Sequence, residues 1–328
     1  MKLGLLMRMT AIIVLFDLFY VAPVHPQDAS VARFPNRPIT YIIPLPAGGD
    51  ADVATRLLAR EAGTILGQPI VVVNKPGGAL TIGISAIAAA KPDGYTIGYT
   101  GPSGMLIVPF MEKLSYHPLK DFQQIMQWGS VNFAVSVRAD SPFKSFKDIV
   151  AYARQNPNKL NYGTSGNLSV QFLLMDQIAR REKVRFTQVP YRGGVEVEAA
   201  ILGGFVDFGA SGFTTSQVDA GKIRLLFLIR EEPSAGYPEI PVLKDVGYGD
   251  MDAPVYLSVA GPAGLPPAIA EILEDAFTRA MREPAFVDRM NKFRLTIVHR
   301  NSREMTEYIA RNYENYGKLL KELGIAKN

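Results

Sequence analysis

Four short loops of small residues carry the groups best suited to chemistry in this sequence. Each loop follows a predicted strand and precedes a helical pattern; they span residues 46–50, 101–104, 163–167 and 191–194. The first N–H groups of a helix have no partner within it, and the helix dipole favours negative charge there. Glycine lets a ligand approach such a backbone, and the hydroxyls of Ser103 and Thr164 can also donate. Glycine and serine also make ordinary turns and caps, so it is the recurrence of the pattern that favours an anion site.

Catalysis has little support from the residue types. The chain has no cysteine and only three histidines, which excludes a thiolate nucleophile and a cysteine zinc site. Ser103, Ser165 and Ser211 stand in Gly-x-Ser-Gly contexts, but none has the glycine two positions later that a nucleophile elbow requires. No metalloprotease, dinucleotide-binding or P-loop motif occurs. We therefore expect a protein that is not an enzyme, with no metal and no cofactor; a hydrolase using Ser165 is the disfavoured alternative.

Length and composition indicate a folded globular protein. The 328 residues suffice for one large or two medium domains, and 48% of them are hydrophobic while 20% are charged. Lys and Arg number 35 against 31 Asp and Glu, a net charge of +4. This surplus is too small to predict a nucleic-acid partner.

The amino terminus is typical of a secretory signal. Lys2 and Arg8 precede an apolar stretch over residues 9–22, interrupted only by Asp17, and a polar segment follows. The stretch is shorter than the roughly 20 residues of a membrane-spanning helix. We predict a signal peptide over residues 1–27 and a periplasmic mature protein, with an uncleaved anchor as the alternative.

The remaining chain alternates short apolar runs with helical patterns, which predicts an α/β fold with largely parallel sheets. The expected strands are 39–43, a buried strand 70–73, 95–99, 131–137, 160–163, 186–190, 206–210, 225–229 and 256–260. A helix over 52–66 should end at Gly67, and Ser145 with Asp148 should cap a helix over 146–155. Further helices are expected over 168–182 and from near Pro267, Pro284 and Ser302.

Several motifs resemble the Bug family of extracytoplasmic solute receptors, the binding proteins of tripartite tricarboxylate transporters. They are Phe34-Pro-Asn-Arg-Pro-Ile39, Ile43-Pro-Leu-Pro-Ala-Gly-Gly49, Leu66-Gly-Gln-Pro-Ile70, Asn74-Lys-Pro-Gly-Gly78, Lys91-Pro-Asp-Gly-Tyr95, Leu160-Asn-Tyr-Gly-Thr-Ser-Gly166 and Val189-Pro-Tyr-Arg-Gly-Gly194. The resemblance implies a type II periplasmic-binding fold, two α/β lobes joined by crossing hinge strands. The lobes would be residues 34–137 with 252–328, and residues 138–251, with hinges near Arg138 and Tyr256.

The resemblance also implies that loop N–H groups and bridging waters hold a ligand carboxylate. Carried over residue by residue, the ligand-binding positions are Ala47, Gly48, Gly49, Asp50, Asp52, Ser103, Thr164, Ser165, Gly166, Asn167 and Ser169. Arg192, beside the fourth loop, is a further candidate because guanidinium pairs well with carboxylate. Where many members carry an Asp-Asn pair this chain has Ala210-Ser-Gly212, which disfavours a ligand with an ammonium group.

These observations predict a receptor that captures a small organic acid, di-, tricarboxylic or aromatic, and delivers it to the membrane permease subunits of a tripartite tricarboxylate transporter. We expect a monomer that does not bind nucleic acid. The alternative is a ligand-sensing protein that signals to a membrane partner through the same pocket without a transport role.

Overall fold

The computed structural model describes residues 33–230, 232–251 and 253–327. The predicted signal peptide, residues 1–27, lies outside these ranges. Residues Pro35–Asn328 form one compact unit that holds every element below. None of the helices in the described ranges combines the length and the apolar character needed to cross a membrane.

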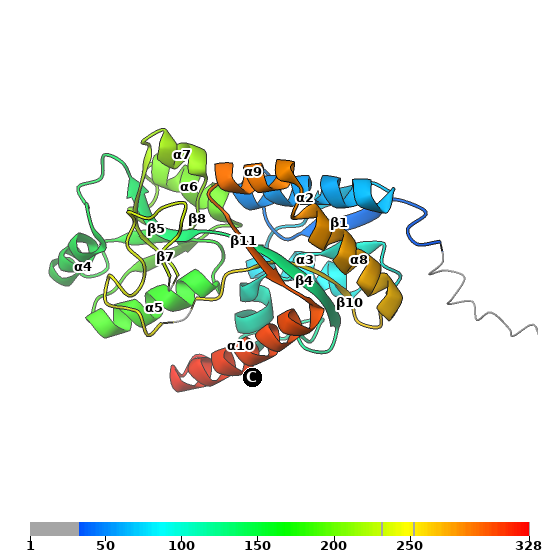
Figure 1. Ribbon diagram of the computed structural model, residues 1–328. Coiled ribbons are helices and arrows are strands. Elements are labelled where there is room, and N and C mark those ends of the chain that lie inside the picture. Colours follow the sequence, from blue (N-terminus) through cyan, green and yellow to red (C-terminus); the bar gives the residue numbers. More distant parts are fainter. Residues whose placement is uncertain (1–32, 231, 252, 328) are drawn as a thin grey trace, which may run out of the picture. The chain divides into compact units, whose positions relative to one another are not determined.

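Two mixed sheets organise the unit (Figure 1). The six-stranded sheet has the order β11-β4-β10-β3-β1-β2, from strands β1 (Ile39–Ile43), β2 (Ile70–Asn74), β3 (Thr96–Gly98), β4 (Phe122–Ser130), β10 (Leu257–Pro262) and β11 (Thr296–Arg300). The five-stranded sheet has the order β7-β6-β8-β5-β9, from strands β5 (Phe133–Arg138), β6 (Asn161–Thr164), β7 (Thr187–Pro190), β8 (Phe208–Gly212) and β9 (Ile223–Leu228). Only Val131 and Asn132 separate β4 from β5, so the chain crosses from one sheet to the other there.

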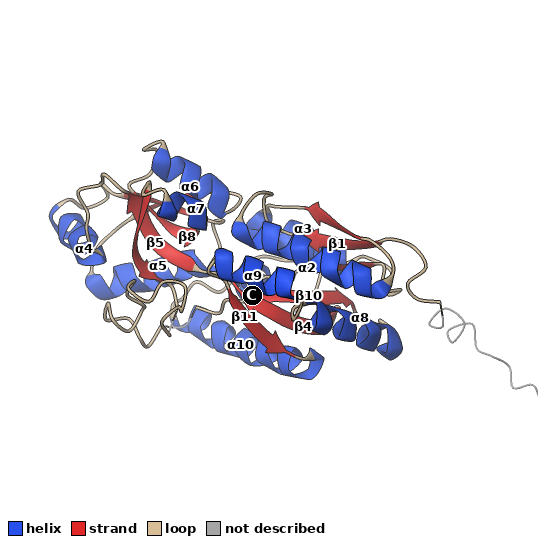
Figure 2. Cartoon of the chain, turned by 45° about the horizontal axis from the view of Figure 1, so that its top comes forward, coloured by secondary structure: helices blue, strands red, loops and turns tan. Residues whose placement is uncertain are grey.

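Helices cover both sheets (Figure 2). Those of the first sheet are α2 (Asp50–Leu66), α3 (Thr81–Ala88), α8 (Pro267–Ala280), α9 (Pro284–Lys292) and α10 (Ser302–Glu322). Those of the second are α4 (Phe146–Gln155), α5 (Val170–Glu182), α6 (Gly194–Leu202) and the short α7 (Thr215–Asp219). Among them, α2 packs on α8, α10 on β4, and both α5 and α6 on β8.

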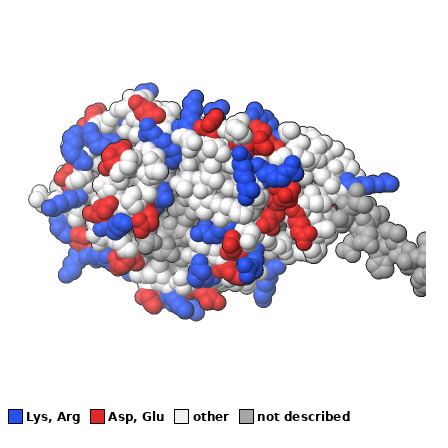
Figure 3. Space-filling view, viewed as in Figure 1, with Lys and Arg blue, Asp and Glu red and all other residues white. Residues whose placement is uncertain are grey.

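Each sheet has its own apolar core. Against the six-stranded sheet, Tyr41 packs on Phe277 and Trp128 on Phe286 at ring distances of 6.2 and 5.8 Å. The five-stranded sheet buries Tyr162, Phe208 and Phe227 among a larger apolar cluster. Charged side chains of both signs are interspersed over the face seen in Figure 3.

The α/β class and most predicted elements are confirmed. Gly67 ends α2 with φ 70° and donates to the carbonyls of Gly63 and Thr64. Ser145 and Asp148 form the predicted capping box of α4. The three C-terminal helices begin at or beside the predicted residues.

Three features of the sheets differ from prediction. Antiparallel pairs outnumber parallel ones, because β10, β11, β5 and β9 each run opposite to their neighbours. Strand β2 was expected to be buried but is an edge strand, and Val71 is 51% exposed. Strand β4 was not predicted, because its three glutamines break the apolar run. The structure satisfies them internally; Gln127, for example, donates to the Gly129 carbonyl at 3.0 Å.

Candidate functional site

The predicted loops meet at one cavity lined by residues from both sheets. Its volume is about 90 Å³, and its lining includes the start of α2, the β4–β5 crossing and the residues after β6 and β8. Since one water needs roughly 10–15 Å³, the cavity has room for a small organic molecule.

Helix α2 presents free donors to this cavity. Its N-cap, Gly49, has no side chain to accept a hydrogen bond, and the first helical bond is Val53 N–H to the Gly49 carbonyl. Among the described residues, no acceptor meets the N–H groups of Asp50, Ala51 and Asp52. All three residues line the cavity. A helix terminus with open N–H groups attracts an anion.

Helix α6 adds a second terminus. Its N-cap is Gly193, and Gly194 and Val195 line the cavity. No acceptor within the described ranges meets the N–H group of either residue. The first turns of α2 and α6, one from each sheet, therefore open onto the same space.

Asp52 holds the loop before α2 in place. Its side chain is 3% exposed, and its Oδ2 accepts from the Gly48 N–H at 3.0 Å and from Arg56 Nε at 3.1 Å. Its Oδ1 accepts from Asn74 Nδ2 at 2.8 Å, and the same amide donates to the Leu45 carbonyl. Gly48 has φ +93°, which a side chain would strain. Asp52 thus acts mainly by fixing the loop.

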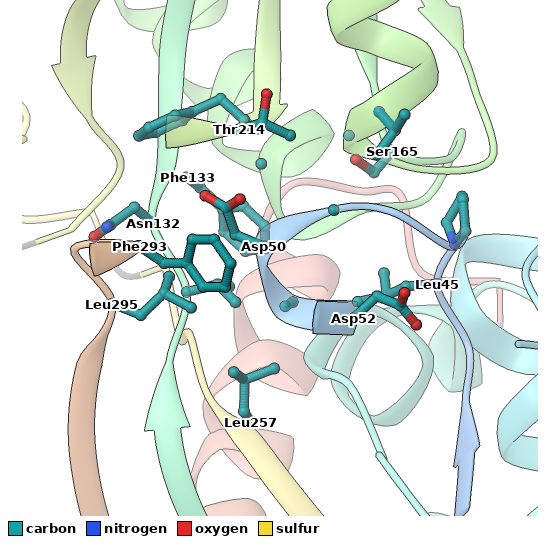
Figure 4. Close-up of a pocket in the computed structure, with 18 of the residues that line it drawn as sticks. Leu45, Asp50, Asp52, Asn132, Phe133, Ser165, Thr214, Leu257, Phe293 and Leu295 are labelled. Carbon is teal, nitrogen blue, oxygen red and sulfur yellow. The ribbon is translucent and has the colours of Figure 1, made fainter. Parts of the chain in front are cut away.

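Asp50 lies in the cavity (Figure 4) and joins the two sheets. Its Oδ2 accepts from the Thr215 N–H at 2.9 Å and lies 2.8 Å from Thr215 Oγ1, across 165 positions of sequence. Burial raises the pKa of Asp50, the Thr215 hydrogen bonds oppose that rise, and Asp219 adds to it. A second contact between the sheets runs from the Val170 N–H to Ser103 Oγ at 3.2 Å.

A second carboxyl lies near Asp50. Glu198, in α6, is 7% exposed and accepts from the N–H and hydroxyl of Thr214 at 2.9 and 2.7 Å. Burial raises the pKa of Glu198, the Thr214 hydrogen bonds lower it, and the Asp50 charge raises it further. Two consecutive threonines thus each hold one carboxyl at this side of the cavity.

The loop after β6 is held mostly by its own hydrogen bonds. Thr164 is fully buried; its hydroxyl donates to the Gly166 carbonyl at 2.8 Å and accepts from Gln188 at 2.7 Å. Ser169 caps α5 by accepting from the Phe172 N–H at 3.1 Å. The Ser165 hydroxyl lines the cavity and has no partner among the described residues.

The structure brings some of the predicted residues to the cavity and leaves others behind it. Those that line it are Gly49, Asp50, Asp52, Ser103 and Ser165. Those in the supporting loops are Ala47, Gly48, Thr164, Gly166, Asn167 and Ser169. Arg192 also lies outside the lining: its side chain is 74% exposed and 4.0 Å from Glu196.

Sequence reasoning missed two lining residues with unpaired polar groups. Gln171, in the first turn of α5, is 2% exposed, and its amide has no partner in the described part of the chain. The Tyr99 hydroxyl is likewise unpaired there, and burial raises the pKa of Tyr99 so that it remains a neutral donor. A glutamine within the apolar run 170–175 was the available signal.

The described lining offers backbone N–H groups and neutral donors, and it includes no Lys, Arg or His side chain. Nor do the described residues contain a cluster of three or more metal-ligating side chains. The arrangement can therefore hold a small anionic group through hydrogen bonds from backbone amides, hydroxyls and a side-chain amide.

Residues 54–325 match the model of the tripartite tricarboxylate transporter family receptor. The chain belongs to this receptor family. A relative from Cupriavidus necator, the UPF0065 protein in the gbd 5' region, is 35% identical over 303 residues, which are 92% of each chain. Protein BugT from Bordetella pertussis is 26% identical over 322 residues, 97% of this chain and 99% of that protein, which confirms the resemblance to Bug receptors.

Solved structures give the same fold. A periplasmic transporter is 28% identical with a TM-score of 0.84, covering 90% of this receptor and all of that chain. MatC from Rhodopseudomonas palustris, solved with bound malate, is 24% identical with a TM-score of 0.81, covering 88% of this receptor and all of MatC. The expected periplasmic-binding fold is confirmed by these likenesses.

Proposed function

We propose that this chain is a periplasmic receptor that binds a small organic carboxylate in the cavity between its two sheets. The observation that carries the proposal is the convergence of open N–H groups from the first turns of α2 and α6 on one space. The Ser165 hydroxyl and the Gln171 amide supply further donors from the second sheet's side. Supporting this reading, MatC, which has the same fold, was solved with a carboxylate, malate.

The mechanism proposed is closure of two lobes on the ligand. The predicted lobes are residues 34–137 with 252–328, and residues 138–251, hinged near Arg138 and Tyr256. Because β5 (Phe133–Arg138) already pairs within the five-stranded sheet, we place the first crossing at Val131 and Asn132 instead of near Arg138. A ligand that contacts N–H groups of both α2 and α6 interacts more strongly with the closed form than with the open one. Binding therefore increases the fraction of molecules in the closed form, to the extent that the ligand's affinity for the closed form exceeds its affinity for the open form. The hydrogen bonds that Thr215 donates to Asp50 and Val170 donates to Ser103 further stabilise the closed form.

The partners proposed are the membrane permease subunits of a tripartite tricarboxylate transporter. The family to which the chain belongs is a receptor family of such transporters. An N-terminal signal peptide over residues 1–27 would take the chain to the periplasm, where a monomeric receptor meets the permease. In a strain lacking this receptor, we expect uptake of the bound acid to fall; unchanged uptake would favour a sensing role.

A thermal-shift screen of the purified chain tests the binding proposal. The panel contains mono-, di- and tricarboxylates, aromatic acids and acidic amino acids, each with its neutral amide as a control. An acid at 100 times its Kd should stabilise the fold by about 2.7 kcal/mol, and its amide should not. The absence of a shift with every acid, in a folded sample shown to hold no co-purified ligand, would refute the proposal.

A further inference from the structure

One end of the cavity has a wall of large apolar side chains. In Figure 4, Ser165 lies to one side of Asp50, while Leu257, Phe293 and Leu295 lie to the other. Leu257 is 1% exposed and Leu295 is 8% exposed, so these side chains form a wall that water scarcely reaches. A ligand whose head group meets the donors near Ser165 would direct its body toward this wall.

The apolar side contains no free charged partner for a second carboxylate. The described lining there includes one amide, Asn132, whose Nδ2 donates to the Arg294 carbonyl at 2.8 Å and whose Oδ1 accepts from Arg230 at 3.2 Å. The Arg294 guanidinium is itself 3.0 Å from Asp219. Arg230 is different: its Nε has no partner among the described residues, but it lies outside the lining, behind Asn132.

Asp50 reinforces this asymmetry. It stands between the two sides, and its carboxyl is fixed by Thr215. Burying an ionised carboxylate without a partner is strongly unfavourable, and a neighbouring carboxylate adds repulsion. Repulsion from Asp50 acts on any carboxylate in the cavity, but the head group meets the open N–H groups of α2 and α6, which offset it. A second ionised group at the apolar wall would meet no such donors.

From this geometry we infer that the ligand is a monocarboxylic acid with an apolar body, aliphatic or aromatic, held by one head group. The inference rests on the proposed function, because it specifies the acid that the same cavity takes. It separates this receptor from MatC, whose bound malate is a dicarboxylate.

Calorimetric titration with matched ligands tests the inference. The pairs are butyrate and succinate, hexanoate and adipate, and benzoate and terephthalate, with 6-aminohexanoate as a further ligand. For the pair that binds, we expect the monocarboxylate Kd to be at least tenfold lower than that of the dicarboxylate. Equal or tighter binding of the dicarboxylate, or tighter binding of 6-aminohexanoate than of hexanoate, would overturn the inference and leave the proposed function standing. Binding of none of these acids, nor of any acid in the panel, would refute the proposed function itself.

A charge introduced into the apolar wall gives an independent test. In Phe293→Arg, the new guanidinium should pair with the second carboxylate of a dicarboxylate. The ratio of the dicarboxylate Kd to the monocarboxylate Kd should therefore fall at least fivefold. Phe205→Arg is the matched control, because Phe205 is 75% exposed and does not line the cavity; its preference should equal that of the parent. Should Phe293→Arg not fold, Leu295→Lys serves the same purpose. An unchanged preference in a folded wall variant would contradict the assignment of this wall to the ligand body.

Discussion

Gln171 illustrates how a single unpaired side chain indicates a ligand contact. The residue is 2% exposed, but among the described residues its amide has neither donor nor acceptor. Its amide atoms keep some contact with solvent, so leaving them unpaired costs less than the roughly 1–3 kcal/mol of a fully buried amide. The cost is recovered if a bound ligand supplies the missing hydrogen bond.

Replacing Gln171 with leucine should therefore weaken binding without weakening the fold. We expect Gln171→Leu to raise the Kd of the tightest-binding acid about fivefold to tenfold, the equivalent of one net hydrogen bond of about 1 kcal/mol. The melting temperature of the free protein should be unchanged or higher. Gln177→Leu is the control on the same helix, since the Gln177 amide donates to the Leu173 carbonyl. An unchanged Kd in Gln171→Leu, measured by calorimetry, would rule out the contact.

The hydroxyls show why the loops were predictable and their individual roles were not. Ser103, Thr164 and Ser169 have the residue types and positions of ligand donors. Thr164 donates its hydroxyl proton to the Gly166 carbonyl, whereas the hydroxyls of Ser103 and Ser169 accept from backbone N–H groups. Ser165 is the one predicted serine whose hydroxyl has neither a donor nor an acceptor among the described residues. A helix cap and a ligand contact require the same residue types, so only the rotamers and neighbours distinguish them.

At the scale of elements, the loop before α2 depends on a carboxylate within the helix it precedes. Asp52 binds the loop through the Gly48 N–H and binds β2 through Asn74. This explains how a loop of small residues keeps a fixed path to the open N–H groups. The motif predicted the loop, but the partner on β2 follows from sheet pairing, which the sequence does not show.

Removing this carboxylate should disorder the loop and weaken binding together. Asp52→Ala removes the acceptor of the Gly48 N–H and one acceptor each of the Asn74 amide and Arg56, and we expect a loss of about 3 kcal/mol in the free energy of unfolding. The Kd of the tightest-binding acid should rise more than tenfold. Asp176→Ala on α5 is the control, because it removes one surface pair with Arg180 and should cost about 0.5 kcal/mol. Urea unfolding and calorimetry measure both quantities; equal losses in the two variants would contradict the role of Asp52.

At the scale of the whole molecule, the two sheets meet through contacts that no local pattern could predict. Asp50 and Thr215 are 165 positions apart, and Thr215 Oγ1 is also 2.9 Å from the Phe293 carbonyl. The sequence predicted the order of strands and helices because apolar periodicity is local. Which loops of the two sheets touch depends on how the sheets are oriented, and the shared cavity follows from that orientation.

The burial of Asp50 between the two sheets should make stability depend on pH. Burial raises the pKa of Asp50, and the Asp50 charge in turn raises the pKa of Glu198. The folded chain therefore binds the Asp50 proton more tightly than the unfolded chain, whose Asp pKa is about 4. The stability that this provides is complete below pH 4 and is lost as the pH rises through the higher folded pKa.

Asp50→Asn imitates the neutral carboxyl and keeps an oxygen for the Thr215 donors. Its melting temperature should match that of the parent near pH 4 and exceed it increasingly toward pH 7. Asp140→Asn is the control with the opposite sign, because the hydrogen bond from Arg138 lowers the pKa of Asp140. If the melting temperature of Asp140→Asn changes relative to the parent, it should fall as the pH rises. If the difference between Asp50→Asn and the parent is constant or shrinks from pH 4 to pH 7, the Asp50 proton does not contribute to holding the two sheets together.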